Sequence, residues 1–313
     1  MAEGKWITGL NADTPVPEAA RTALDIRLGV VYRYLKASLE EPDRDPENVH
    51  QLRVGLRRVG AALDVFVSCL PRRLHDKIRH RLRRLRRAAG SVRDWDVFLL
   101  ELDRHCGTEP GRDFLFGYGF QARSQAQKKL DKVGKPLLQC FADLRAKVMG
   151  SIDDSARANR RLLRDFASQS VLEHYQRFAK TLRGDLNDPA DLHEIRKSGK
   201  RLRYTMELFA KCFAPEFRSR LYPMVEAMQE ILGKVNDSYV AEAKLADLKE
   251  KLRRGWPEKW PRFRPVLDVL LKFHRQRLPA EKRRFLKWHQ SWLRAHAGEQ
   301  LKKLVKAASP GKT

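Results

Sequence analysis

Long apolar runs are missing from this sequence of 313 residues, and their absence excludes one broad class of protein. No stretch reaches the roughly 18 apolar residues that a membrane-spanning helix needs. The opening residues, MAEGKWITGL, do not place a basic segment before a long apolar stretch, so a secretory signal is not expected. We therefore expect a cytoplasmic protein that does not use a membrane.

Cysteine is scarce, and several well-known chemical motifs are absent. The four cysteines form no CxxC pair and lie among apolar or helix-forming neighbours, which favours buried free thiols over a disulfide or a metal site: Cys69, Cys106, Cys140 and Cys212. The glycine-rich phosphate loops GxxxxGK[ST] and GxGxxG do not occur, and neither does the GxSxG serine elbow. No cofactor, metal or catalytic residue is expected from these patterns.

Acidic residues are few relative to basic ones. The chain has 39 Asp and Glu against 64 Lys and Arg, a formal net charge of +25. Such an excess repels itself, and it is usually maintained because a polyanion or an anionic surface neutralises it. The hydrophobic share of 42% is that of an ordinary globular chain, so the charge is carried on a folded core.

Alternating β-branched residues are also absent, and the helix formers Arg, Leu, Ala, Lys and Glu dominate. The sequence predicts an all-α fold of about ten helices with short connections, which favours antiparallel bundles. The last residues, 301–313, are expected to form a flexible basic tail. Helix breaks are expected at these points: 41–48, Pro71, 90–94, 107–111, 183–191, Pro215, 233–237, 254–261 and Pro279.

The most informative pattern is an internal repeat. HQLRVGLRRVGAALDVF (50–66) matches HEIRKSGKRLRYTMELF (193–209) at an offset of 143 residues, and the offset holds without a gap. The Gly-x-Val-x-Asp pattern of 90–94 also recurs at 233–237. This shared offset predicts a duplication, with one half in 5–150, a second in 151–300 and a pseudo-twofold axis between them.

Each copy of the repeat places a ladder of cations on one helical face. In the first copy, Leu52, Leu56 and Val59 form a core stripe, and the ladder lies on the opposite side. Like charges at this spacing destabilise an isolated helix by about 0.2–0.5 kcal/mol per pair. A solvated face explains most charge runs, but a ladder that occurs twice favours an anion-binding face. The two ladders consist of His50, Arg53 and Arg57, and of His193, Arg196, Lys200 and Arg203.

An arginine-rich segment follows the first ladder only. In residues 72–90 the apolar positions keep core spacing, and six arginines surround them: Arg79, Arg81, Arg83, Arg84, Arg86 and Arg87. The equivalent positions of the second half carry none of these arginines. We therefore expect an asymmetric anion site that is stronger on the N-terminal side.

Three functions remain open on the residues alone. Guanidinium groups match phosphate oxygens bidentately, so the ladders suit an extended phosphate polymer, and a nucleic acid would satisfy the same charge. A metal-dependent phosphohydrolase is the third reading, because His50 and Asp94 recur as His193 and Asp237. One histidine and one aspartate per half are too few ligands for a metal. We expect the two aspartates to be N-caps, or to pair with a ladder cation.

The segments VHQLRVGLRRVGAALDVF and GSVRDWDVF, with their second copies LHEIRKSGKRLRYTMELF and LGKVND, resemble the CHAD family, the conserved histidine α-helical domain. The resemblance covers about residues 5–300. It implies a single domain built of two pseudo-symmetric antiparallel four-helix bundles. Their basic faces would line a central groove or pore that binds inorganic polyphosphate, at polyphosphate granules, without catalysis.

One residue departs from the family pattern: Gly60 stands where the first motif often has another arginine, and the arginine-rich segment is expected to offset this loss. The resemblance, the ladders and the arginine-rich segment together define the expected polyphosphate site: His50, Arg53, Arg57, Arg58, Arg79, Arg83, Arg86, Arg93, His193, Arg196, Lys197, Lys200, Arg201 and Arg203.

Overall fold

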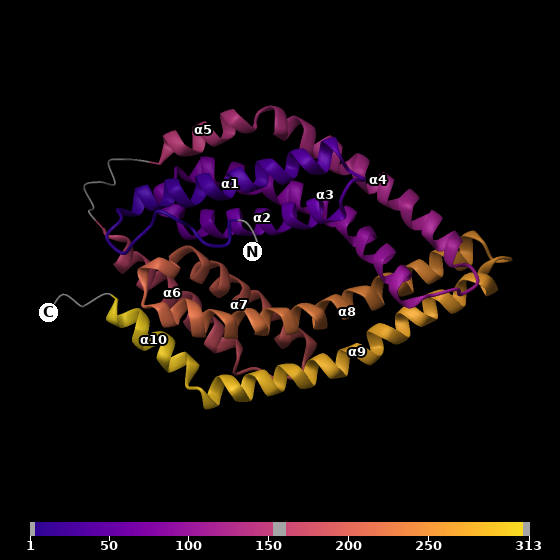
Figure 1. Cartoon of the computed structure of the whole chain (residues 1–313). Coiled ribbons are helices and arrows are strands. Elements are labelled where there is room, and N and C mark those ends of the chain that lie inside the picture. The colour runs from indigo at the N-terminus through magenta and orange to yellow at the C-terminus, as the bar shows by residue number, and fades with distance from the viewer. Residues whose placement is uncertain (1–3, 153–160, 309–313) are drawn as a thin grey trace.

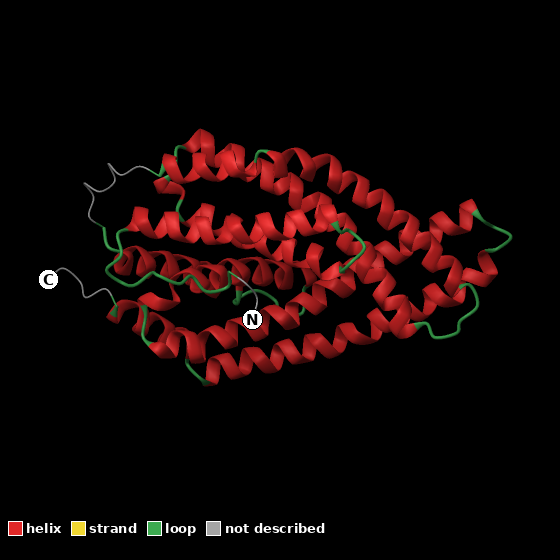
Figure 2. Ribbon diagram, turned by 45° about the horizontal axis from the view of Figure 1, so that its top comes forward, coloured by secondary structure: helices red, strands yellow, loops and turns green. Residues whose placement is uncertain are grey.

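The computed structural model describes residues 4–152 and 161–308, and this part of the chain contains ten α-helices and no strand (Figures 1 and 2). The predicted all-α fold is therefore confirmed. The first five helices are α1 (Val16–Glu40), α2 (Pro46–Val65), α3 (Arg72–His105), α4 (Arg112–Gln139) and α5 (Phe141–Ser151). The second five are α6 (Leu163–Thr181), α7 (Pro189–Phe209), α8 (Tyr222–Gly255), α9 (Trp260–Arg294) and α10 (Ala297–Ala307).

The ladder helices α2 and α7 begin in the same way. Asp45 accepts a hydrogen bond from the backbone N–H of Glu47 at 2.7 Å, and Asp188 accepts one from Ala190 at 3.2 Å. Each cap precedes a proline, which is well placed in a first helical turn because its missing N–H has no intrahelical partner there. Equivalent residues of the two copies thus fix equivalent helix starts.

The structure is consistent with the predicted pseudo-twofold axis. Both halves run through four long helices and a short fifth, and α3 and α8 each have 34 residues. The equivalent residues Phe66 and Phe209 contact each other edge to face, with ring centroids 5.9 Å apart. A residue that touches its own counterpart lies close to a twofold axis.

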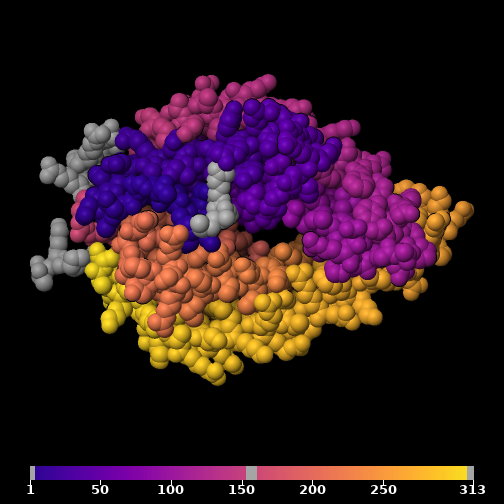
Figure 3. Space-filling view, in the orientation of Figure 1, coloured from indigo at the N-terminus to yellow at the C-terminus, as the bar shows by residue number. Residues whose placement is uncertain are grey.

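The two halves meet at two places (Figure 1). One large core joins both halves around α1, α2, α6 and α7, and a smaller core fills the far ends of α3, α4, α8 and α9. Between these junctions, Figure 3 shows a hollow bordered by the N-terminal half on one side and the C-terminal half on the other. The short helices α5 and α10 lie on opposite outer sides of the molecule.

Three expected helix breaks are wrong. Helices α3, α8 and α9 run without interruption through 90–94, 233–237 and Pro279 respectively. Gly90 has a packing role within its helix, because the side chain of Arg53 lies against it and donates a hydrogen bond to its carbonyl at 3.0 Å. Tertiary packing of long amphipathic helices overrides the local preference of glycine and proline here.

The expected flexible tail is also wrong over residues 301–307, because α10 extends to Ala307. Leu301 and Val305 are fully buried, and the hydroxyl of Ser168 donates to the carbonyl of Val305 at 3.0 Å. Residues 309–313 and the linker 153–160 lie outside the described residues. The four cysteines are free thiols as predicted, and none of the described helices is long and apolar enough to cross a membrane.

Candidate polyanion-binding site

The two predicted ladders face each other where α2 packs against α7. Lys200 of α7 lies among Arg196 and Arg203 of its own helix, Arg57 of α2 and Arg86 of α3. Arg53 and Arg93 continue this group along α2 and α3. We call these seven residues the central cationic cluster: Arg53, Arg57, Arg86, Arg93, Arg196, Lys200 and Arg203.

The pKa of Lys200 shows the effect of the positive charges around it. Burial, together with the charges of the surrounding arginines, lowers the pKa of Lys200 to about 7. Burial and neighbouring guanidinium groups also lower the pKa of Arg86. Within the described part of the chain, Arg57, Arg86 and Lys200 form no ion pair with an acidic residue, so no carboxylate there pairs with their charges.

Two aspartates lie at the edge of the cluster. Asp94 is 3.7 Å from Arg53 and also pairs with Lys244 of α8, which joins the two halves. Asp237 lies close enough to Arg53 and Arg196 to oppose the lowering of their pKa by burial. Both aspartates lie inside helices, so the predicted N-cap role is wrong. The predicted pairing of Asp94 with a ladder cation is confirmed.

Arg79 of α3 supplies a guanidinium group next to Gly60, where the first ladder lacks an arginine. The guanidinium group of Arg79 reaches over Gly60, where a β-carbon would come within 2.5 Å of its nitrogen. The same group donates to Asp64 at 2.8 Å, and this ion pair holds it in place. A residue of the arginine-rich segment therefore restores a cation at the position that Arg203 occupies in the second half.

The two histidines lie at the ends of the ladders in different surroundings. His50 is half-buried, and burial with the charges of Arg93, Arg57 and Arg53 lowers its pKa, so its ring is neutral at pH 7. His193 is exposed, with Nδ1 3.3 Å from the side-chain oxygen of Asn236. No group of three or more potential metal ligands occurs among the described residues. Both rings are placed to donate or accept hydrogen bonds at the cluster's edge.

Arg58 is a correction to the predicted site. Its side chain is 5% exposed and donates to the fully buried Glu207 of α7 at 2.9 Å. The hydroxyl of Tyr222 donates to the other oxygen of Glu207 at 2.9 Å, and the buried Arg27 donates to the carbonyl of Arg58 at 2.8 Å. Arg58 therefore joins the two halves inside the core and is not exposed to a ligand at the surface.

Lys197 and Arg201 also lie away from the central cationic cluster. Lys197 is exposed and pairs with Glu194 at 2.7 Å, one helical turn away. Arg201 is exposed, and its charge acts on His174 of α6. Arg83 is exposed beside Arg86 on the edge of the cluster. Helical periodicity predicted which face of each helix carries the ladder, but it did not distinguish the ladder cations from neighbouring cations such as Lys197 and Arg201, which point elsewhere.

Sequence reasoning missed two contributors. The ring of Tyr204 lies under the guanidinium of Arg203, with 5.1 Å from the ring centroid to Cζ. The sequence could have indicated this residue, because Tyr204 follows Lys200 by one helical turn. Lys244 has no such signal, because it reaches Asp94 only through the docking of α8 near α3.

The second half has no counterpart of two arginines of the arginine-rich segment. Glu226 and Gln229 stand where the first half has Arg83 and Arg86. Glu226 pairs with Lys5 at 2.7 Å, and Gln229 donates to the carbonyl of Arg196 at 3.1 Å. The second half thus uses these positions for internal contacts.

The comparisons with known proteins agree with this architecture. Residues 10–246 match the family model described as the CHAD domain. The structure is similar to the crystal structure of the CHAD domain from the plant Ricinus communis, with 26% identity, a TM-score of 0.70, and coverage of 91% of this chain and 94% of that one. It also resembles PptA from Streptomyces chartreusis in fold, with 18% identity, a TM-score of 0.61, and coverage of 88% and 100%. No curated protein matches the chain. Since the family model covers more than half of its length, this chain belongs to the CHAD domain family.

Proposed function

We propose that this protein binds inorganic polyphosphate in the central cationic cluster and does not change it chemically. The observation that carries the proposal is the gathering of Arg57, Arg86 and Lys200, from three helices, in one place without an acidic partner among the described residues. Burial and, after it, the repulsion of the surrounding arginines lower the pKa of Lys200, and a bound anion would offset that repulsion. Polyphosphate binding is a general property of the CHAD family.

A linear polymer suits the cluster better than one small anion. The cations are spread along α2, α3 and α7, so consecutive phosphate units would each meet guanidinium groups. Guanidinium binds phosphate oxygens in bidentate geometry, and the neutral His50 ring adds a hydrogen-bond donor. Because every neutralised phosphate releases counterions, the affinity would fall steeply with salt.

A nucleic acid is the second candidate, because it carries the same phosphates. Single-strand binders combine cations with aromatic rings on which bases stack. Trp288 and Trp292 do not serve this purpose, since they are 8% and 4% exposed and pack in the core. Tyr204, beside the cluster, is 4% exposed and already stacks with Arg203. These positions favour a polyanion without bases.

The phosphohydrolase reading gains no support from the geometry. Asp94 is held by Arg53 and Lys244, so it is not free to join His50 at a metal. A phosphate-release assay with polyphosphate tests this reading directly. Release that depends on His50 and His193 would favour it over binding alone.

Charge reversal in the cluster tests the binding proposal. The double variant Arg53→Glu/Arg196→Glu is expected to abolish the retardation of polyphosphate in a native gel and to keep its helical circular dichroism. The matched control is Lys197→Glu/Arg201→Glu, which makes the same change of net charge on exposed positions of α7 away from the cluster. Equal loss in both variants would show that net charge alone governs binding.

We further propose that this binding brings the protein to polyphosphate granules in the cell. A fluorescent fusion should coincide with polyphosphate staining, and the Arg53→Glu/Arg196→Glu fusion should spread evenly. Granule localisation of that variant would show that localisation does not depend on the central cationic cluster.

A further inference from the structure

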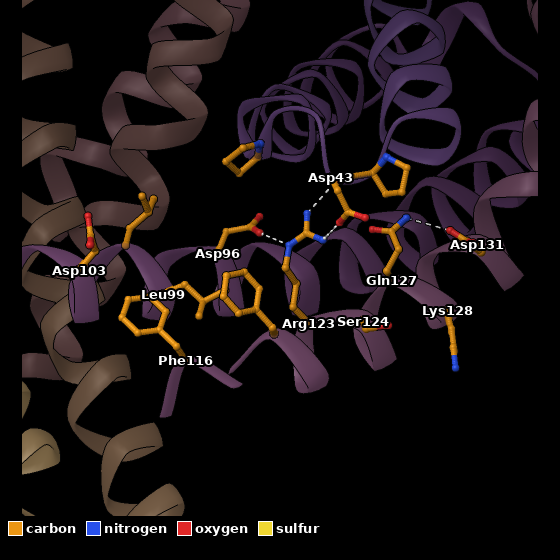
Figure 4. Close-up of a pocket in the computed structure, with 14 residues that line it drawn as sticks. Asp43, Asp96, Leu99, Asp103, Phe116, Arg123, Ser124, Gln127, Lys128 and Asp131 are labelled. Carbon is orange, nitrogen blue, oxygen red and sulfur yellow. Dashed lines mark hydrogen bonds and ion pairs between the residues drawn. The ribbon is translucent and has the colours of Figure 1, made fainter. Parts of the chain in front are cut away.

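A second cavity, of about 750 Å³, lies on another face of α3, between α3, α4 and the loop that joins α1 to α2 (Figure 4). Its volume is within the range of about 300–1,000 Å³ that is typical of small-molecule sites. None of its lining residues belongs to the central cationic cluster. The proposed polyphosphate function therefore does not explain it.

The lining of this cavity is acidic although the chain as a whole is strongly basic. Two of its carboxylates pair with cations outside the lining, Asp103 with Arg112 at 2.9 Å and Asp131 with Lys135 at 3.3 Å. Four carboxylates line it in all, against the two lining cations Arg123 and Lys128: Asp43, Asp96, Asp103 and Asp131. Figure 4 shows Lys128 pointing away from the other polar side chains. Arg123 is fully engaged, because it donates to Asp96 at 2.7 Å, to Asp43 at 2.8 Å and to the carbonyl of Pro42 at 2.7 Å.

Two buried oxygens in the wall of the cavity lack a hydrogen-bond donor among the described residues. Asp96 is 3% exposed, and its Oδ1 accepts from Arg123 while its Oδ2 accepts from nothing. Gln127 is 8% exposed, and its amide nitrogen donates to the carbonyl of Ser38 at 2.9 Å and to Asp131 at 2.8 Å. These two bonds fix the amide so that Oε1 is the unpaired atom. Unpaired buried acceptors are costly, so a donor is needed here.

The other end of the cavity is mainly apolar, although Asp103, which pairs with Arg112 at 2.9 Å, also lies there (Figure 4). Leu99, Phe116 and Phe120 line it, and Phe120 is 58% exposed, which is unusual for so large an apolar side chain. In Figure 4, Leu99 and Phe116 lie at one end, and Asp43 and Gln127 lie together at the other. The cavity thus has an acceptor-rich end and an aromatic end.

We propose that this cavity binds a small organic cation, namely a protonated primary amine on an apolar body. An ammonium group brings three donors and a positive charge to the end that holds Asp43 and Gln127. The apolar body would lie against Phe116 and Phe120 and remove them from water. A phosphate or a carboxylate would instead bring further acceptors to a wall where the unpaired oxygens of Asp96 and Gln127 need donors.

Titration of the full-length protein with 4-phenylbutylamine tests the charge requirement, with 4-phenylbutan-1-ol as the neutral isostere. The amine should bind saturably in NMR or calorimetric titrations. The alcohol should bind at least roughly 10-fold more weakly, since hydrogen bonds to charged groups are stronger than those between neutral groups. Equal affinity of the two compounds, or no saturable binding of the amine, would overturn the proposal.

Variants then locate the site. Asp43→Asn changes a side chain that is 87% exposed, so it should fold normally and bind the amine roughly 5-fold more weakly. The control, Asp247→Asn, makes the same charge change at a side chain that is 65% exposed on α8 and should bind like the unaltered protein. Ser124→Trp fills the cavity from an exposed position and should abolish binding. Equal affinity of the Asp43 and Asp247 variants, or undiminished binding by the Ser124 variant, would contradict this location.

Discussion

Arg57 and Lys200 occupy equivalent positions in the two copies of the repeat, and the fold brings their charges together at the junction of α2 and α7. Duplication therefore placed two unfavourable cation ladders opposite each other. Lys200 is half-buried, and burial together with the neighbouring arginines lowers its pKa. Phe66 and Phe209, also equivalent, hold the same junction together through an aromatic contact.

The first prediction concerns stability and pH. Lys200 has a folded pKa of about 7 against 10.5 for the ordinary side chain. Between these two pH values the unfolded chain binds more protons at this residue than the folded chain does. The charged Lys200 therefore destabilises the fold at low pH, and the free energy of unfolding increases as pH rises from about 7 to about 10.5. Lys200→Met should flatten this rise in urea denaturation between pH 7 and 9, whereas Lys197→Met should not.

The second prediction concerns protons taken up on binding. Bound phosphates favour the charged form of Lys200, so its pKa should rise when polyphosphate binds. At pH 8 the binding enthalpy should then differ between two buffers of unlike ionisation enthalpy. The difference should be smaller in Lys200→Met. An unchanged difference in that variant would assign the proton to another group.

The third prediction separates stability from binding. Glu207 is fully buried and accepts from Arg58 and Tyr222. Glu207→Gln should lower the free energy of unfolding by about 3–5 kcal/mol, because it leaves buried guanidinium groups without their counter-charge. The exposed Glu194→Gln, which loses only the pair with Lys197, should leave the free energy of unfolding almost unchanged. Similar urea midpoints for the two variants would refute the structural role of Glu207.

The fourth prediction compares two arginines of α3. Arg86 lies beside Arg57 in the cluster, whereas Arg81 lines a groove with Lys132 of α4. Arg86→Gln should weaken polyphosphate binding and reduce the slope of log affinity against log salt by roughly 0.7. Arg81→Gln, with the same change of charge, should leave the slope unchanged. Equal slopes for the two variants would show that Arg86 contributes no more to polyphosphate binding than Arg81, which lies outside the cluster.

The fifth prediction tests the role of the acidic edge. Asp94 and Asp237 reduce the positive charge of the cluster, so Asp94→Asn/Asp237→Asn should bind polyphosphate more tightly, by roughly 0.5 kcal/mol per residue. Direct titration at constant salt measures this change. Weaker binding would indicate that the carboxylates hold the arginines in position.

Much of this architecture was predictable from particular residues. The offset between His50 and His193 gave the duplication, and the spacing of Arg53 and Arg57 gave the face that meets the other half. Helix continuity through Gly90 was not predictable, because it depends on the contact with Arg53. The burial of Arg58 was not predictable either: its counterpart Arg201 is exposed, and only the docking of Glu207 distinguishes them.

The measurement that tests the central claim most directly is a titration of the protein and of Arg57→Glu/Lys200→Glu with long-chain polyphosphate, with RNA as competitor at equal phosphate concentration. The central cationic cluster predicts saturable binding that falls steeply between about 50 and 200 mM salt, resists RNA and disappears in the variant. Displacement by RNA at equal phosphate concentration, or undiminished binding by the variant, would contradict it.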